Sequence, residues 1–516
     1  MVYQESAGRS RNDGQSKTVT TASPFVSLIK ERILAQAANL ESKSRSGPHE
    51  SAKKNRSIWI LNPAADLTLI IGAPLLIFIG IMAAKGIWSS ATITSFIMIW
   101  AIGHHLPGMM RAYGDPDLFR RFWVRLILAP LFLLAVCIFS FWTTVNSGLI
   151  AIAAIWGWWH YLMQAYGFVR IYDSKAGSFA ATTRWLDQGM CLTWFAAAVV
   201  LNDNALYEFI ENFYNSGLGV PAPQTIATLQ AVVKSATAAI TTLFVINMVV
   251  RYRRGDQPSP VKVLLMVATF GAFWYSAATV TNIIVAYAFF ELFHDVQYLT
   301  IVWAFNRNRV KKDQQLEGFT RFLFRPRVML VGVYICLVFA YGSLNWATGL
   351  IDQQERYQLT RVLSAVFITS TLLHYYFDGF IWKLRESPTQ TTLGIEKQKT
   401  GRFGFSVPTW LRHGMLWMLF IVPFGYLSVA QVLDAMDRQD DVDHVKWNRR
   451  IQESQQLVAC TPESVNAHFT LGLAYEAQEL FEEAEREYQA ALGIFPKHSM
   501  SIDGVERVQR RQTQQP

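Results

Sequence analysis

Charged residues are scarce in this chain. Only 16% of its 516 residues are Asp, Glu, Lys or Arg, whereas about a quarter is usual in soluble globular proteins. Hydrophobic residues make up 51% of the sequence. This composition excludes a typical soluble domain, because a nonpolar medium must solvate much of the chain.

Cysteine and the common metal motifs are also largely lacking. The four cysteines are Cys137, Cys191, Cys336 and Cys460. Three of them lie in apolar runs, so the chain has neither a disulfide framework nor a zinc framework. An H-E-x-x-H zinc-protease motif and the clustered H-x-x-H-H boxes of membrane desaturases are absent. The Glu291-x-x-His294 half-motif occurs once, where a carboxylate di-iron bundle requires two copies.

The positive charge is divided among short clusters. The net charge is +9, but Lys and Arg stand between apolar runs rather than on one polar domain. This distribution favours membrane topology over nucleic-acid binding. The basic first 57 residues contain no early apolar segment, so we expect no cleavable signal peptide and assign insertion to the first span.

The long apolar runs predict an all-α polytopic membrane helix bundle of about eleven spans. We expect a basic cytosolic region at 1–57, the bundle at 58–433 and an extracytoplasmic helical tail at 434–516. The predicted spans are 66–85, 90–110, 122–143, 148–169, 185–201, 230–250, 261–280, 282–304, 328–349, 360–382 and 411–433.

The connections between the spans indicate their orientation. Lys and Arg concentrate in alternate connections, with Lys85, Arg356 and Arg361 as the main exceptions. Basic connections remain cytosolic, which places the N-terminus in the cytosol and the C-terminus outside. In a bacterium the membrane would be the inner membrane.

Both ends of the chain carry helical patterns. Phe25, Leu28, Ile29 and Ile33 recur at helical spacing beside basic residues, as in an interfacial amphipathic helix. A helix docked on the cytosolic face of the protein itself would have the same pattern. Residues 465–498 resemble one tetratricopeptide repeat. That tail is either a cap on the membrane domain or a module that binds a partner protein, because one repeat cannot bury its own apolar face.

Five of the ten histidines lie in or at the ends of the apolar spans. Ionisable groups at such positions are costly and usually functional. His104 is seven residues before Arg111, His160 ten before Arg170, His294 thirteen before Arg307 and His374 nine before Lys383. At 1.5 Å per residue these separations are roughly 10–20 Å. We therefore expect His104, His105, His160, His294 and His374 to form one layer in the cytosolic half of the membrane.

Polar residues accompany these histidines at helical spacing. Glu291, His294, Asp295 and Tyr298 share one helix face, and Asp378 follows His374 by one turn. Imidazoles with a nearby carboxylate bind Fe, Zn, Cu or Mn. We therefore predict a metal site held by the histidines, with Glu291, Asp295, Asp378 and Tyr298 as the candidate catalytic residues. The same residues suit a proton or ion pathway, or purely structural polar pairs.

The residues around the histidines resemble the microbial membrane-integral β-carotene dioxygenases, the Brp/Blh-like family. The resemblance is carried by Gly103-His104-His105-Leu106-Pro107-Gly108, by His160-Tyr161-Leu162-Met163, by Phe293-His294 with Val302-Trp303, and by His374 with Asp378. It covers about 60 residues. Tyr298 stands where the family has a further histidine, and the family's H-G-x-L-D motif is not reproduced. The resemblance implies Fe(II), molecular oxygen and oxidation of an isoprenoid or other lipid.

Three functions follow as hypotheses. The first is an iron-dependent membrane oxygenase with an apolar lipid-like substrate, in which His104 or His105 is a ligand. The second is an ion- or proton-coupled transporter, and the third is a non-catalytic assembly component that recruits partners through its tail. Arg111, Arg170 and Arg307 follow the histidines and either hold an acidic head group or anchor the cytosolic side.

Overall fold

The computed structural model describes residues 57–256, 258–279, 283–312, 318–344, 353–382, 392, 408–439 and 443–514. The chain divides into two compact units, Met1–Arg56 and Ser57–Pro516. The amphipathic helix expected within 25–40 lies outside the described residues. All that follows concerns the second unit.

The expected all-helical fold is confirmed, since the described residues form helices and no strand. The first half holds α2 (Pro63–Ala65), the π-helix η1 (Asp66–Ile71), α3 (Ala73–Lys85), α4 (Ser90–Gly103), α5 (His105–Gly114), α6 (Pro116–Trp142), α7 (Ser147–Lys175), α8 (Ala181–Val200), α9 (Asp203–Tyr214) and α10 (Pro223–Arg253). The second half holds α11 (Pro260–Thr279), α12 (Ile283–Lys312), α13 (Gly318–Leu323), α14 (Val328–Gly342), α15 (Gln353–Ile381), α17 (Thr409–Gln439), α18 (Asp443–Cys460), α19 (Val465–Ala477), α20 (Phe481–Ile494) and α21 (Ser499–Gln512).

Several helices are suited to a membrane. Each of the eleven predicted spans overlaps a helix. By length and composition, four helices among the described residues could cross a membrane, or up to six if each of two bent pairs counts as one span. The number eleven is therefore not confirmed. α7 falls outside this group because His160, Gln164 and its tryptophans lower its mean hydropathy.

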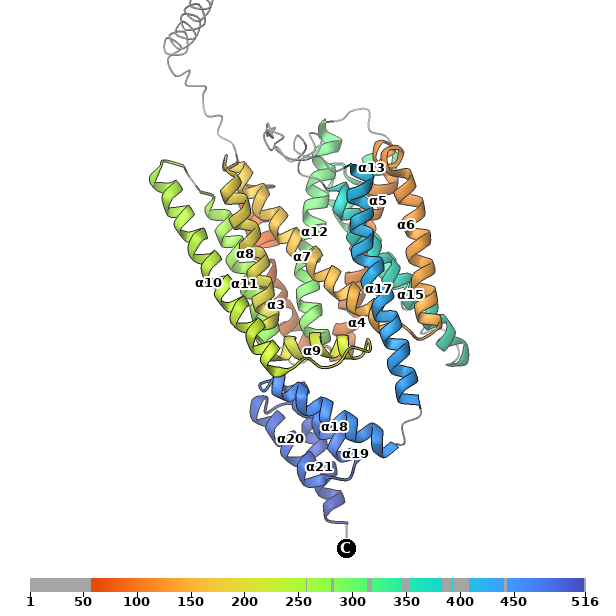
Figure 1. The fold of residues 1–516 in the computed structure, drawn as a ribbon. Coiled ribbons are helices and arrows are strands. Elements are labelled where there is room, and N and C mark those ends of the chain that lie inside the picture. Colours follow the sequence, from red (N-terminus) through yellow and green to blue (C-terminus); the bar gives the residue numbers. More distant parts are fainter. Residues whose placement is uncertain are drawn as a thin grey trace, which may run out of the picture. The chain divides into compact units, whose positions relative to one another are not determined.

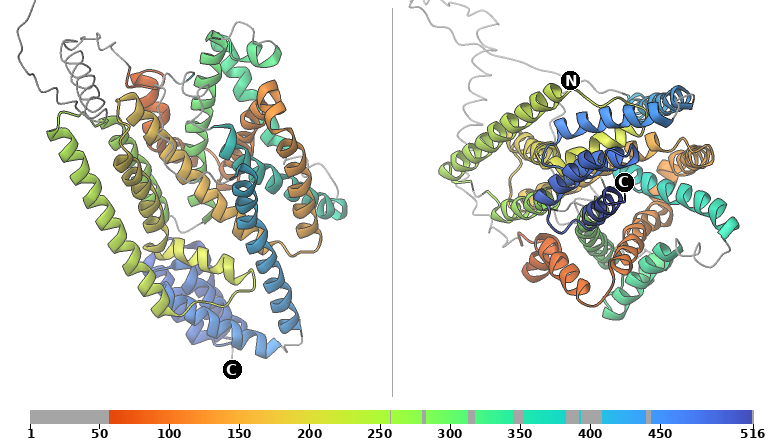
Figure 2. Two further views of the ribbon diagram at one scale, coloured as in Figure 1. Left: turned by 45° about the horizontal axis from the view of Figure 1, so that its top comes forward. Right: turned by 90° about the horizontal axis from the view of Figure 1, so that it is seen from below.

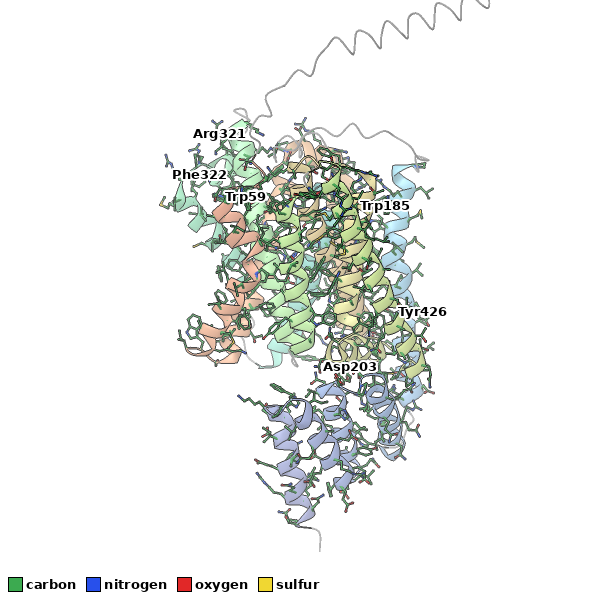
Figure 3. The ribbon with its side chains drawn as sticks, turned by 90° about the vertical axis from the view of Figure 1, so that its left-hand side faces the viewer. Trp59, Trp185, Asp203, Arg321, Phe322 and Tyr426 are labelled. Atoms are coloured by element: carbon green, nitrogen blue, oxygen red, sulfur yellow. The ribbon has the colours of Figure 1, made fainter. Side chains whose placement is uncertain are left out.

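Apolar side chains remain exposed on the outer helices. The apolar windows of α10 and α17 are each only 11% buried within the protein. Trp185 is 73% exposed and Tyr426 is 65% exposed, and Figure 3 labels both on the outer surface of the bundle. Such continuous apolar surface is typical of helices in contact with lipid. The fold is consistent with a membrane protein.

α7 joins the two main cores of the bundle. One core combines residues of α7, α8, α11 and α12, and the other combines α6, α7, α15 and α17. Figure 1 shows α7 crossing obliquely between these groups. The histidine-bearing faces of α7, α12 and α15 therefore meet in the interior.

Glycines bring α4 and α14 together beside the histidines. A Cβ on Gly103 would collide with the carbonyl oxygen of Val338, and a Cβ on Gly342 would collide with that of Ile99. Only glycine permits this close approach of two backbones. His104 follows Gly103 directly and caps α4 before α5 begins, so the close packing fixes the position of the first histidine.

A buried ion network lies at one end of α7. Arg170 NH1 is 2.8 Å from Asp173 Oδ2 and 2.6 Å from Asp187 Oδ2. Lys262 Nζ is 3.1 Å from Asp173 Oδ1 and 2.8 Å from Asp187 Oδ1. Two cations and two carboxylates therefore neutralise one another. This arrangement removes Arg170 as a head-group ligand, because its charge is already paired.

The segment between α8 and α10 contains a helix, α9, which contacts the C-terminal tail. Asp203 Oδ2 accepts a hydrogen bond from the backbone N–H of Glu463 at 2.9 Å, and the hydroxyls of Tyr207 and Thr470 lie 2.9 Å apart. Figure 3 labels Asp203 at this junction, and Figure 2 shows α9 next to the tail helices. The tail is therefore packed on the bundle. α19 and α20 form the expected helix–turn–helix, while its assignment as a tetratricopeptide repeat stays a prediction.

Candidate metal centre

The histidines expected in one layer do gather in the interior of the bundle. His104 lies at the junction of α4 and α5, His160 on α7, His294 on α12 and His374 on α15. All four are at most 8% exposed. The centroid of the His374 ring is 4.6 Å from those of His104 and His160 and 6.4 Å from that of His294.

The ring nitrogens are spaced as ligands of one ion would be. His104 Nε2 and His374 Nε2 are 3.1 Å apart. Two nitrogens bound at about 2.1 Å to a metal ion lie about 3 Å apart when they occupy neighbouring positions. One nitrogen each from His104, His294 and His374 all fall within 4.8 Å of one another. This donor set could hold a metal ion.

Local contacts determine which ring nitrogen of His104 can bind a metal ion. Its Nδ1 contacts the carbonyl oxygen of Ala101 and lies 2.9 Å from Asp295 Oδ1. A proton on Nδ1 is donated to the carbonyl oxygen of Ala101, with the Asp295 carboxylate beside it, and the lone pair of Nε2 is left to face His374. Metal-binding histidines are usually held in this way, with the second ring nitrogen donating to a carbonyl or carboxylate.

Several buried nitrogen and oxygen atoms of the cluster have no hydrogen-bond partner, as is expected of atoms that bind a ligand. His160 Nε2, His294 Nε2 and His374 Nδ1 make no hydrogen bond, nor do Glu291 Oε2 and the two oxygens of Asp295. Buried polar atoms in folded proteins normally have a hydrogen-bond partner. These atoms come from three helices and belong to neighbouring groups with metal-ligand spacing, where a bound cation would supply the missing partners.

The carboxylates divide between two sides of the cluster. Glu291 Oε1 lies 3.9 Å from His104 Nδ1, so Glu291 and Asp295 adjoin His104. Asp378 Oδ2 lies 3.9 Å from both His160 Nε2 and His374 Nδ1. These residues form two further groups with metal-ligand spacing, each of which shares a histidine with the first group.

Tyr298 adjoins the cluster through Asp378. Its hydroxyl donates to Asp378 Oδ1 at 3.0 Å and lies 3.4 Å from Trp382 Nε1, which donates to it. The centroids of the Tyr298 and His374 rings are 5.0 Å apart. Tyr298 can therefore orient Asp378 and pass a proton to it.

His105 occupies a different position from His104. Its Nδ1 lies 3.0 Å from Ser370 Oγ, and that hydroxyl is also 2.9 Å from Tyr341 OH. The ring stacks on His374 with centroids 4.8 Å apart. His105 belongs to none of the metal-ligating groups found among the described residues. The geometry favours His104 as the ligand of the doublet.

Two residues beside the site were not singled out in the sequence. Ser370 precedes His374 by one helical turn, a spacing that places both on one face of α15. Gly108 was quoted only for the family resemblance. A Cβ on Gly108 would lie 2.8 Å from Tyr298 OH and 3.7 Å from His374 Nδ1. A side chain here would collide with Tyr298, so Gly108 lets the backbone of α5 approach the cluster closely, which its sequence position alone does not reveal.

Comparison of the chain with known protein families, with curated proteins and with solved structures found no significant match. The resemblance to Brp/Blh-like dioxygenases therefore stays a prediction carried by the residues quoted for it. Arguments about function rest on the geometry of the site.

Proposed function

We propose that this protein is an integral membrane metalloenzyme, an iron-dependent oxygenase that acts on an apolar lipid or isoprenoid-like substrate. His104, His160, His294 and His374 would hold the metal. Iron, when bound, would supply the activation of molecular oxygen. Zn, Cu and Mn accept the same nitrogen and oxygen donors, so the identity of the ion is a separate part of the proposal.

One observation carries the proposal. Ring nitrogens of His104, His294 and His374 lie within 4.8 Å of one another, and His160 forms a second group with His374 and Asp378. His160, His294 and His374 each have a buried ring nitrogen without a hydrogen-bond partner. A structural histidine in such surroundings is expected to hydrogen-bond to a neighbour. Convergence of several unpaired donors on one point is the arrangement that a metal ion requires.

The remaining polar residues would serve the chemistry around the ion. Asp295 and Glu291, which lie on the Nδ1 side of His104, would hold its imidazole in the tautomer and orientation that present Nε2. Tyr298 and Asp378, which already share a hydrogen bond, would move a proton at the Asp378 carboxylate. The apolar surroundings would admit a lipid chain and restrict water.

The number of membrane spans and the sides on which the two termini lie are part of the same proposal. Eleven spans, a cytosolic N-terminus and an extracytoplasmic C-terminus would place the histidine layer in the cytosolic half of the membrane. The tail would then lie outside the cytosol, docked on α9, with its repeat-like α19 and α20 open to a protein partner. Labelling of single introduced cysteines in oriented vesicles tests this orientation.

The decisive experiment is metal analysis of the detergent-purified protein. The wild type is compared with a variant that carries His160→Ala, His294→Ala and His374→Ala, and with His413→Ala as a matched control. His413 is a bundle histidine whose Nε2 lies 3.1 Å from Tyr376 OH and 3.2 Å from Trp417 Nε1, outside the cluster. We expect near-stoichiometric metal in the wild type and the control and none in the triple variant. Equal metal content in all three would contradict the site.

A proton or ion pathway is the second candidate function. It is favoured by the buried carboxylates Glu291 and Asp295, which have oxygens without hydrogen-bond partners. A relay of this kind would need no bound transition metal. Proton uptake into vesicles that lack metal, lost on Asp295→Asn, would support transport in place of oxidation.

A further inference from the structure

The arginines that follow the histidines in the sequence differ sharply in the structure. Arg170 is neutralised by Asp173 and Asp187, as described above. Arg111 is only 9% exposed, yet its Nε and NH1 make no hydrogen bond. A buried guanidinium without an acceptor is unfavourable, since it loses its hydration without replacement. Arg307 has one nitrogen without a hydrogen bond, its Nε, and Arg111 has two, so the guanidinium of Arg111 lacks the most acceptors.

Aromatic rings hold the Arg111 side chain in a fixed plane. Its Cζ atom lies 4.0 Å from the centroid of the Phe305 ring and 3.9 Å from that of the Trp382 ring. Stacking engages the faces of the guanidinium and leaves its N–H groups, which lie in the plane, for hydrogen bonds. This fixed fork matches the two oxygens of a carboxylate or phosphate.

The charged neighbours of Arg111 leave two of its N–H groups without an acceptor. Arg111 lines a shallow opening at the protein surface together with Pro107, Met110, Asp115, Asn306 and Arg309. Arg309 NH1 is 2.6 Å from Asp115 Oδ2, so these two residues neutralise each other. Asp115 and Asp378 attract Arg111 electrostatically, but neither accepts a hydrogen bond from its Nε or NH1. The opening therefore presents guanidinium N–H groups without an acceptor, which suits an acidic group from outside.

The opening is also connected to the histidine cluster through α5. Arg111 follows His104 by seven residues, or about 10 Å along a helix. Gly108 lies between them, and a Cβ there would already lie 2.8 Å from Tyr298 OH. A head group held at Arg111 would therefore lie about two helical turns from the metal site.

We propose that Arg111 binds the carboxylate or phosphate head group of an amphipathic lipid, and so sets which end of the substrate lies at the histidine cluster. This inference rests on the proposed lipid-oxidising function. It adds the chemical class of the substrate, an acidic amphiphile, and a residue that positions it.

The test measures binding of dodecyl phosphate and lauric acid to the full-length protein in an uncharged detergent, with dodecanol as the uncharged probe. Arg111→Gln should bind the two acidic probes about 10- to 100-fold more weakly than the wild type, because a hydrogen bond to a charged group contributes about 1.5–3 kcal/mol. Arg111→Lys should lose less affinity for the acidic probes, since lysine keeps the positive charge but lacks the planar set of N–H donors. Dodecanol binding should not change.

Arg125→Gln is the matched control. Arg125 also stacks on aromatic rings, with its Cζ 5.4 Å from the Phe122 centroid, but it does not line the opening. It should bind all probes as the wild type does. Equal affinity of Arg111→Gln and the wild type for the acidic probes would overturn the proposal. Inorganic phosphate that binds as tightly as dodecyl phosphate would overturn the lipid assignment and indicate a free-anion site.

Metal content separates this inference from the proposed function. Arg111→Gln should retain the metal of the wild type, because Arg111 is not in the cluster. Loss of metal in that variant would overturn the head-group role. Absence of metal from the wild type would refute the proposed enzyme, whereas loss of acidic-probe binding alone in Arg111→Gln would leave Arg111 as an anion site.

Discussion

The two adjacent histidines at the start of α5 should differ strongly in metal binding. His104 Nε2 faces His374 Nε2 at 3.1 Å, while His105 hydrogen-bonds to Ser370 outside the cluster. We therefore predict that His104→Ala removes a ligand and that His105→Ala does not. The two variants remove the same chemical group from neighbouring positions, so each serves as the control for the other.

The size of the difference follows from the energy of metal binding. Structural zinc sites with four ligands bind with about 10–16 kcal/mol. Division among four ligands gives roughly 3–4 kcal/mol each, and one lost ligand then weakens binding by about 100- to 1,000-fold. The hydrogen bond from His105 contributes about 1 kcal/mol to stability. Its loss should therefore alter metal affinity by less than about tenfold.

Anaerobic equilibrium dialysis against Fe(II), and separately against Zn(II), measures both affinities. Size-exclusion chromatography in detergent checks that each variant is folded. Retention of wild-type affinity in His104→Ala together with its loss in His105→Ala would refute the assignment. Equal losses in both would show that the doublet acts through the packing of α5 and not through one ligand.

Three further predictions follow from the same contacts. Tyr298→Phe removes the hydrogen bond that orients Asp378 and should weaken metal binding by roughly 10- to 100-fold, measured in the same dialysis. Lys262→Met leaves two buried carboxylates with a single cation and should lower the free energy of unfolding by about 3–5 kcal/mol, measured by denaturation in mixed micelles. The hydrogen bond to Glu487 raises the pKa of His468 above 6.5. Its stabilisation is complete below pH 6.5 and is lost as the pH rises through the folded-state pKa, so proteolysis of the tail should quicken with pH in the wild type and less so in His468→Gln.

The sequence predicted the helical bundle and the meeting of its histidines for a physical reason. Apolar runs of membrane length must form helices, and basic residues fix the depth of each helix end. His104, His160 and His374 are separated from such basic residues by seven to ten positions. Their common depth could therefore be inferred before any contact between the helices was known.

Features that depend on distant partners could not be predicted in this way. Arg111 and Arg170 look alike in the sequence, since each follows a histidine by a few helical turns. Only the fold brings Lys262 and Asp187 to the end of α7, where Arg170 is neutralised. The helix α9 is different, because the buried Leu206, Tyr207, Ile210 and Tyr214 recur with a helical period that the sequence does contain.

Removal of metal should destabilise the whole bundle, because the cluster is costly without a cation. Six atoms of His160, His294, His374, Glu291 and Asp295 are buried without a hydrogen bond. Each costs about 1–3 kcal/mol, or about 6–18 kcal/mol together, which is similar to the 10–16 kcal/mol that a bound metal supplies.

That cost is also comparable to the net stability of about 5–15 kcal/mol of an ordinary domain, so the metal-free form should be marginal. Chelator treatment should therefore lower the Tm of the wild type in detergent and leave unchanged that of the variant with His160, His294 and His374 replaced by Ala. Readdition of Fe(II) or Zn(II) should restore the wild-type Tm. A wild-type Tm indifferent to both treatments would mean that water or side-chain rearrangement satisfies these atoms, and that the convergence of the histidines has a structural cause.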